Sequence, residues 1–319
     1  MIKKRMLNVL LVGLMALSLA GCSVEGESKK TENSDTQQNE IGKVGFAIST
    51  LNNPFFVSMA DGAESKAKEL GIDLTVIDAG NDTAKQSSDI EDLIAKGIKV
   101  LIVNPEDSAS VAPAVSDAME AGIKVIAVDR SVDGTEVDCF IGTDNVKAGE
   151  QAGGYLAEKL GDGAKIAILE GIPGASSALD RNEGFLNAVD GKLEVVASQT
   201  ANFDRAEGLS VTENILQAHP DIKAILSAND EMALGAIEGI ESAGKIPGKD
   251  ILVTGFDAGD DAIVAVNDGK MLFTVEQKTT EMGEMAVESA LKMMQGESVE
   301  KEIPIDITLL DADALKDME

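Results

Sequence analysis

The segment "KVGFAISTLNNPFF", residues 43–56, joins an apolar run to a polar stretch and then to two adjacent phenylalanines. The run "KVGFAI" is typical of a buried strand, and Pro54 after two asparagines is typical of a helix start. Aromatic residues are scarce, with 8 Phe, 1 Tyr and no Trp in the chain. Two Phe residues placed together where a strand ends leave two interpretations open, packing in the core or contact with a ligand.

The same alternation of strand and helix continues along the chain. Further apolar runs are "IDLTVIDA", "KVLIVNP", "IKVIAVD", and then "KIAILEG", "LEVVASQT", "IKAILSAN", "DILVTGFD" and "MLFTVEQ". Helices are expected between the early runs, and then near residues 145–160, 177–190, 205–218, 230–243 and 280–295. Such alternation predicts parallel sheets with helices on both faces. Roughly a dozen strands are too many for one ordinary open sheet. The sequence therefore predicts an α/β fold of two similar doubly wound parallel-sheet lobes, with "IPIDITLL", residues 303–310, as a strand of either lobe.

The N-terminus has the features of an export signal. Lys3, Lys4 and Arg5 precede the apolar run "LNVLLVGLMALSLA", which is too short to span a membrane comfortably, and "LAGC" follows. These features predict a signal peptide over residues 1–21. The almost wholly polar composition after it predicts a flexible tether over residues 22–42.

Composition excludes several classes of function. The formal net charge is −29, which argues against binding to nucleic acid or to anionic lipid. The chain has one histidine, His219, and two cysteines, Cys22 and Cys139, so a His/Cys zinc site or a catalytic triad is out of reach. Neither G-x-G-x-x-G nor a Walker pattern follows any expected strand. We therefore expect no metal, no cofactor and no nucleic-acid partner, while chemistry by a carboxylate pair stays open.

Polar and aromatic side chains gather just after the expected strands or at the starts of the helices that follow them. They are Ser49, Asn53, Phe55, Phe56, Asp129, Arg130, Arg181, Phe203, Asn229, Asp257 and Gln277. Ligands of open parallel sheets bind at the carboxyl ends of the strands. Amides, carboxylates and guanidinium groups can bond the hydroxyls of a sugar, and aromatic rings can stack on its C–H faces. The set is therefore typical of a sugar-binding site.

Simpler interpretations exist for single members of this set. An Asp or Asn after a strand is often a turn residue or a helix cap, and Asp230 is expected to be a cap. Asp129 and Arg130 could form a surface ion pair of little energetic value. The binding interpretation gains support because the polar groups recur at the same end of successive strands.

The segments "STLNNPFF", "VDRS", "NFDR", "ANDEMALGA", "VTGFD" and "AVNDGK" closely resemble the D-ribose-binding branch of the periplasmic binding protein family, which serves bacterial ABC sugar importers. The resemblance covers about residues 43–310. It implies a type I fold in which a three-segment hinge joins a first lobe, residues 43–143 and 277–304, to a second lobe, residues 144–276 and 305–319. It also implies that all eleven side chains named above contact the sugar, with Phe56 and Phe203 on opposite faces of the ring. Separately, "LAGC" resembles the lipobox of bacterial lipoproteins and implies lipidation of Cys22.

The function implied is capture of D-ribose, or a similar small sugar, between closing lobes and its delivery to the membrane subunits of an ABC permease. The protein would be a monomer without enzymatic activity, anchored through Cys22 outside the cytoplasmic membrane of a Gram-positive-type bacterium. Alternatives are a binding protein for another pentose, allose or a furanose signal, and a sensor that serves a receptor. The export signal disfavours a sugar-responsive repressor, and an exported enzyme would need paired carboxylates in the cleft.

Overall fold

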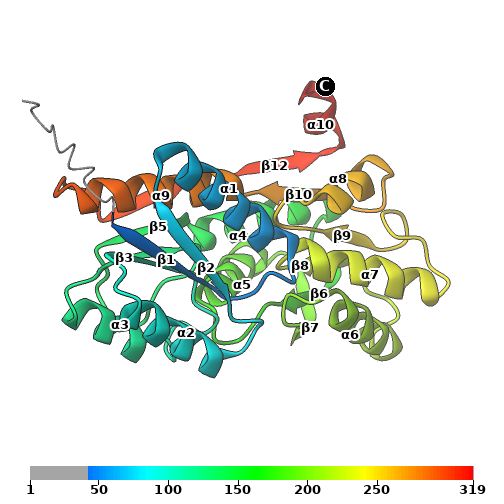
Figure 1. Cartoon of the computed structure of the whole chain (residues 1–319). Coiled ribbons are helices and arrows are strands. Elements are labelled where there is room, and N and C mark those ends of the chain that lie inside the picture. Colours follow the sequence, from blue (N-terminus) through cyan, green and yellow to red (C-terminus); the bar gives the residue numbers. More distant parts are fainter. Residues whose placement is uncertain (1–41, 319) are drawn as a thin grey trace, which may run out of the picture. The chain divides into compact units, whose positions relative to one another are not determined.

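A computed structural model describes residues 42–318, which contain two six-stranded sheets (Figure 1). The predicted signal peptide, Cys22 and nearly all of the predicted tether lie outside the described residues. The first sheet has the order β11-β5-β4-β3-β1-β2 and is parallel throughout. Its strands are β1 (Lys43–Ile48), β2 (Asp73–Asp78), β3 (Val100–Val103), β4 (Lys124–Val128), β5 (Cys139–Thr143) and β11 (Glu302–Ile305).

The second sheet has the order β12-β10-β9-β8-β6-β7 and repeats the arrangement of the first. Its strands are β6 (Lys165–Glu170), β7 (Glu194–Thr200), β8 (Ala224–Ser227), β9 (Leu252–Thr254), β10 (Phe273–Glu276) and β12 (Thr308–Asp311). All its neighbours are parallel except β12, which runs antiparallel to β10. The predicted fold class, two doubly wound α/β lobes, is confirmed.

The segment "IPIDITLL" differs from its prediction as one strand. The structure divides it at Asp306 and Ile307 into β11, which pairs with β5, and β12, which pairs with β10. The chain thus passes between the sheets three times: after β5, after β10 and between β11 and β12. At the second crossing Lys278 has a φ of 52°, in the left-handed region that residues other than glycine rarely adopt.

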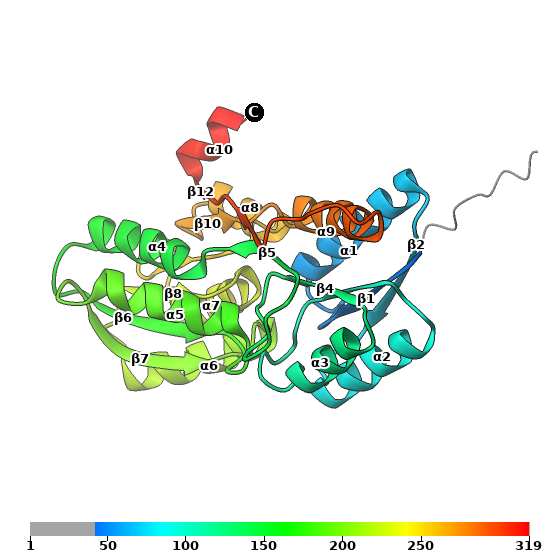
Figure 2. The ribbon, with the colours of Figure 1, turned by 90° about the vertical axis from the view of Figure 1, so that its left-hand side faces the viewer.

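Helices cover both faces of each sheet (Figures 1 and 2). The first lobe contains α1 (Pro54–Leu70), α2 (Thr83–Ala95), α3 (Ala112–Glu120) and α9 (Thr279–Met294). The second contains α4 (Asn145–Leu160), α5 (Ser176–Val189), α6 (Arg205–Ala218), α7 (Asp230–Ser242), α8 (Asp260–Asn267) and α10 (Ala312–Met318). The sequence did not predict α8 and α10, whose eight and seven residues are too short to show a clear helical period. No helix of residues 42–318 is both long and apolar enough to span a membrane.

Alternation along the strands divides the core of the first lobe in two. Val44, Phe46 and Ile48 of β1 belong to the cluster that packs against α1 and α9. Ala47, between them, belongs to the cluster that packs against α2 and α3. Both faces of the sheet are therefore buried, and the open end of the sheet lies at the carboxyl ends of the strands.

Three pairs of helices cross at backbone contact distance: α1 with α9, α4 with α5, and α6 with α7. Each helix of each pair contributes a glycine at the crossing, and a Cβ added there would lie less than 3.0 Å from the backbone of the partner helix. These glycines are Gly62 and Gly283, Gly149 and Gly184, and Gly208 and Gly235. The absence of a side chain is thus what sets the separation of these helices.

We predict that Gly149→Ala destabilises the protein relative to Gly154→Ala, although both residues lie in α4. At Gly149 the new methyl group would lie 2.5 Å from the carbonyl oxygen of Arg181 on α5, whereas at Gly154 no atom lies within 4 Å. Both variants gain the same helix propensity, about 1 kcal/mol. The crossing should cost Gly149→Ala about 1–3 kcal/mol of unfolding free energy. Urea unfolding measures the difference, and equal stabilities would contradict the role of the crossing.

Candidate functional site

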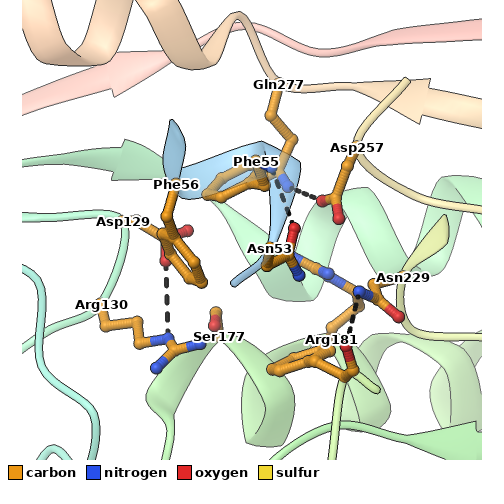
Figure 3. Close-up of a pocket in the computed structure, with 11 residues that line it drawn as sticks. Asn53, Phe55, Phe56, Asp129, Arg130, Ser177, Arg181, Asn229, Asp257 and Gln277 are labelled. Atoms are coloured by element: carbon orange, nitrogen blue, oxygen red, sulfur yellow. Dashed lines mark hydrogen bonds and ion pairs between the residues drawn. The ribbon is translucent and has the colours of Figure 1, made fainter. Parts of the chain in front are cut away.

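A cavity of about 250 Å³ lies between the carboxyl ends of the two sheets (Figure 3). It is lined by Asn53, Phe55, Phe56, Asp129, Arg130, Ser177, Arg181, Phe203, Asn229, Asp257 and Gln277. Both lobes contribute, the first from α1 and the end of β4, and the second from α5 and from loops after its strands. The structure thus brings together all of the side chains predicted from the sequence except Ser49.

Ser49 lies behind the cavity wall and is fully buried. Its hydroxyl donates a hydrogen bond of 2.6 Å to Oδ1 of Asn104, and Nδ2 of Asn104 donates one of 3.1 Å to Oδ2 of Asp129. Ser49 therefore supports the position of Asp129 through Asn104, a residue that the sequence analysis missed. Ser177 takes a place in the lining instead. It precedes Arg181 by four residues on α5, and that spacing on one helix face could have revealed it.

The two adjacent phenylalanines are positioned by the start of α1. Asn53 is the N-cap, and its Oδ1 accepts a hydrogen bond of 2.9 Å from the backbone N–H of Phe55. The Phe55 and Phe56 rings meet edge to face, with centroids 5.0 Å apart. Asn53, Pro54 and the Phe pair thus form one local unit that caps the helix and places both rings beside the cavity.

Arg130 is buried among aromatic rings and carboxylates. Its guanidinium carbon lies 5.1 Å from the Phe56 ring centroid and 5.7 Å from that of Phe203. Nε lies 3.5 Å from Oδ2 of Asp129, and Nη1 lies 3.6 Å from Oε2 of Glu106 and donates to the carbonyl of Pro105 at 2.8 Å. Because Arg130 and Asp129 are both buried, the alternative of a surface ion pair is wrong.

Arg181 is the second buried guanidinium of the cavity, and it is held from three sides. Nε and Nη2 donate to Oδ1 of Asn145 at 3.2 and 2.7 Å, and Nη1 donates to the carbonyl of Ala228. Its guanidinium carbon lies 3.6 Å from the centroid of the Phe256 ring. Asn145 and Phe256 were not identified from the sequence, because contacts between distant segments leave no local pattern.

The side of the cavity near β10 is formed by three polar residues. Nε2 of Gln277 donates a hydrogen bond of 2.8 Å to Oδ1 of Asp257. Asn229 is the N-cap of α7, where its Oδ1 accepts from the N–H of Met232 at 3.0 Å. The expectation that Asp230 is the cap is therefore wrong, since Asp230 is the first residue of the helix itself. Asn229 combines the capping role with a place in the cavity lining.

Burial makes the charged forms of ionisable groups in the cavity less favourable. Removal from water raises the pKa of Asp129, and the positive charges of Arg130 and Arg181 oppose this shift. Removal from water also raises the pKa of Asp257 well above its ordinary value, with a further contribution from the negative charge of Asp230. Burial lowers the pKa of Arg181. These groups lower the stability of the fold, which is typical of sites kept for function.

The cavity can bond a ligand that both donates and accepts hydrogen bonds. Among the described residues, Nε of Arg130 and Oε1 of Gln277 are buried and have no hydrogen-bond partner in the protein. A hydroxyl group of a ligand can accept a hydrogen bond from Nε–H of Arg130 and donate one to Oε1 of Gln277. No cluster of three or more His, Cys, Asp or Glu side chains within residues 42–318 could hold a metal ion.

The two lobes also touch directly beside the cavity. The N–H of Ser108 donates to the carbonyl of Gly174 at 2.9 Å, and the N–H of Ser176 donates to the hydroxyl of Ser108 at 3.2 Å. The N–H of Ser131 donates to the hydroxyl of Ser176 at 2.9 Å. We call these four residues the serine contact, and it contains no member of the cavity lining.

Two doubly wound lobes that enclose a polar and aromatic cavity at their sheet ends define the class of two-lobed solute-binding proteins. Residues 44–298 match the family described as periplasmic binding protein domain. The chain belongs to this family.

Two curated relatives share much of the sequence. The ribose import binding protein of Bacillus subtilis (strain 168) is 44% identical over 96% of this chain and 98% of its own length. That of Escherichia coli (strain K12) is 46% identical over 84% and 90%. A solved structure of a periplasmic solute-binding protein from Actinobacillus succinogenes with bound D-allose is 36% identical, with a TM-score of 0.80, over 86% of this chain and 99% of that one.

We predict that Asp257→Asn stabilises the ligand-free protein at neutral pH, on the order of 1 kcal/mol. The pKa of Asp257 is raised in the folded state, so its ionised form destabilises the fold above that pKa. As the pH falls from the folded pKa toward the unfolded value of about 3.9, the carboxyl becomes neutral and the destabilisation disappears. Urea unfolding of variant and parent from about pH 7 to about pH 4.5 should show the advantage of the variant shrinking. An advantage that stays constant over this range would refute the electrostatic explanation.

Proposed function

We propose that this chain is an extracytoplasmic solute-binding protein that captures D-ribose between its lobes and delivers it to an ABC permease. The observation that carries the proposal is the lining of the cavity, in which donors, acceptors and aromatic rings from both lobes surround a space of about 250 Å³. The likeness to two ribose import binding proteins supports ribose as the sugar.

The hydrogen-bonding groups fit a ring of hydroxyls. Asp129 and Asp257 offer carboxylate oxygens to hydroxyl protons, while Arg130 and Arg181 offer N–H groups to hydroxyl oxygens. Bonds to charged groups are about twice as strong as neutral ones, and exclusion of water strengthens them further. The guanidinium groups are held by carbonyl, amide and aromatic contacts, so they keep their positions before the sugar arrives. Rigid placement of this kind reduces the entropy lost on binding.

The size of the cavity favours a single small sugar. Its empty space of about 250 Å³, part of which is open to solvent, is surrounded by lining residues that are mostly buried. Phe55, Phe56 and Phe203 supply apolar surface for the C–H groups of a ring. The relative that holds D-allose supports a second candidate, a binding protein for a hexose such as allose, because its fold and sequence are similar to those of this chain.

Capture would proceed by closure of the lobes. We assign residues 43–143 and 277–305 to the first lobe and residues 144–276 and 306–319 to the second. The last boundary falls one residue later than predicted, because Ile305 pairs with Thr143 in the first sheet. A sugar that bonds Asp129 on one lobe and Asp257 on the other interacts more strongly with the closed form than with the open form. This difference in affinity drives closure. The closed form, a monomer, would then be the form that the permease membrane subunits recognise.

We predict that isothermal titration calorimetry detects D-ribose binding, and that Asp129→Ala weakens it by at least about 30-fold. Loss of a buried charged acceptor leaves a hydroxyl and Arg130 unpaired, which costs about 2–5 kcal/mol. Titration of allose and other pentoses in parallel tests the choice of sugar. Absence of heat with ribose but binding of allose would favour the second candidate.

A matched control is Glu136→Ala. Glu136 also pairs with a cation, Lys301, but its side chain is 85% exposed. An exposed ion pair contributes less than about 1 kcal/mol to the stability of the fold. Neither Glu136 nor Lys301 lines the cavity. Ribose affinity should therefore be unchanged in this variant, and an equal loss in both variants would show that Asp129 acts outside the site.

We further propose that the protein is anchored to the outer face of the cytoplasmic membrane, in a bacterium of Gram-positive type, through a lipid on Cys22. The proposal rests on the sequence "LAGC" after a basic and apolar leader. Such an attachment would keep the protein near its permease where no outer membrane encloses it.

Replacement of Cys22 by Ala should release the protein from membranes. The acceptor thiol for the lipid would be lost, and binding of the sugar should be unaffected. Fractionation of cells that express the variant measures the effect. Cys139→Ala is the control, because Cys139 is buried in β5 and should not influence location. Retention of the Cys22 variant with membranes would place the anchor elsewhere.

A further inference from the structure

Asp230 is a buried carboxylate that does not line the sugar cavity but holds a segment that does. The residue is 4% exposed and begins α7. Its Oδ2 accepts a hydrogen bond of 2.8 Å from the N–H of Gly259, and its Oδ1 accepts one of 2.7 Å from the hydroxyl of Thr274. Within residues 42–318 it forms no ion pair. Burial raises its pKa to about 6, so this carboxylate lowers stability without compensation from a cation.

The segment that Asp230 holds has an unusual backbone. Asp257 has a φ of 123° and Ala258 one of 57°, values that favour glycine and that a side chain normally avoids. Such a conformation persists only where the surroundings enforce it. The N–H of Ala258 donates to the hydroxyl of Thr274 at 3.1 Å, and this same hydroxyl donates to Asp230. The two N–H groups that follow Asp257 in the chain are therefore both fixed by Asp230, one directly and one through Thr274.

The segment is also fixed just before Asp257. The backbone N–H of Asp230 donates to the carbonyl of Phe256 at 2.8 Å. At Gly255 an added Cβ would lie less than 3.0 Å from Oδ1 of Asp230, so the backbone passes directly against the carboxylate. Residues 255–259 thus bend around Asp230, and Asp257 at the middle of this bend points into the cavity (Figure 3).

We propose that Asp230 is a positioning residue for sugar binding, which holds the strained bend of residues 255–259 and thereby aims the Asp257 carboxylate at a hydroxyl of the ligand. The inference rests on the proposed function, because Asp257 must contact the sugar for its position to affect affinity. Asp230 itself makes no contact with the sugar. A structural role in α7 alone would not explain why its two oxygens bond to Gly259 and Thr274 rather than to the helix.

The test is a double-mutant cycle of Asp230→Asn with Asp257→Ala, read as ribose affinity by calorimetry. Asn keeps the size of the side chain but presents an N–H₂ group to one of the two donors. Loss of a hydrogen bond to a charged group should weaken binding by roughly 10- to 100-fold in the parent. In the Asp257→Ala background the same change should cost less than about twofold, the usual error of additivity. An equal cost in both backgrounds, or no cost in the parent, overturns the proposal.

Two controls separate positioning from loss of folding. Thr274→Val removes the bridging hydroxyl, and Thr274→Ser keeps it, so ribose affinity should fall in the first variant and be retained in the second. If Asp230→Asn fails to fold, the two Thr274 variants serve as the test instead. An equal loss of ribose affinity in Thr274→Val and Thr274→Ser would overturn the proposal. Asp250→Asn alters another carboxylate of the second lobe that accepts a loop N–H, that of Ile246, and should leave affinity unchanged.

Hydrogen exchange distinguishes this inference from the proposed function. Without any ligand, Asp230→Asn should accelerate exchange of the Ala258 and Gly259 amides and leave that of Met232 unchanged. If the parent does not bind ribose but this acceleration occurs, the proposed function fails while the hold on the bend stands. If ribose binds and exchange is unchanged, the positioning role fails alone.

Discussion

The close crossing of paired helices is the constraint on which the cavity depends. Gly149 of α4 contacts the carbonyl of Arg181 on α5, and Gly184 of α5 contacts the backbone near Val146 on α4. The side chain of Arg181 lines the cavity while its carbonyl lies at the crossing, so the separation of the two helices directly sets where the guanidinium lies. The α1–α9 and α6–α7 crossings act in the same way on the helices that follow Asn53 and Phe203. Rigid packing of the helices thus fixes the positions of the polar side chains in the cavity.

A second level of organisation surrounds the lining residues. Arg130, Arg181 and Asp129 each contact a buried partner outside the cavity lining: Glu106, Asn145 and Asn104, respectively. Asp257 lies in the bend that Asp230 holds. Burial makes each of these charges unfavourable, and the fixed partners keep each charged side chain in its rotamer. The large apolar cores of both lobes stabilise the fold and offset the destabilisation by these buried charges.

Sequence reasoning predicted the parts of this architecture that leave a local pattern. Apolar runs alternating with helical stretches indicated two doubly wound lobes, and the ends of those runs indicated most of the cavity lining. What it missed depends on contacts between distant segments. Nothing near Ser49 shows that Asn104 lies between it and the cavity, and nothing in "IPIDITLL" shows that pairing with β5 and then with β10 divides it. The sequence alone does not distinguish Asn229 from Asp230 as the cap of α7, because Asn and Asp favour that position equally.

The serine contact has a consequence for the molecule when no sugar is present. Its hydrogen bonds join Ser108, Ser131, Gly174 and Ser176 across the lobes without any part of the cavity lining. Each bond of this kind contributes about 1 kcal/mol, so under the proposed closure of the lobes the contact would favour the closed form of an empty molecule. Too strong a contact would present the importer with empty carriers that compete with loaded ones. Too weak a contact would make every sugar supply the whole free energy of closure from its own binding. Under the proposed function, the sensitivity of uptake to scarce sugar would depend partly on these backbone and hydroxyl groups, which do not line the cavity.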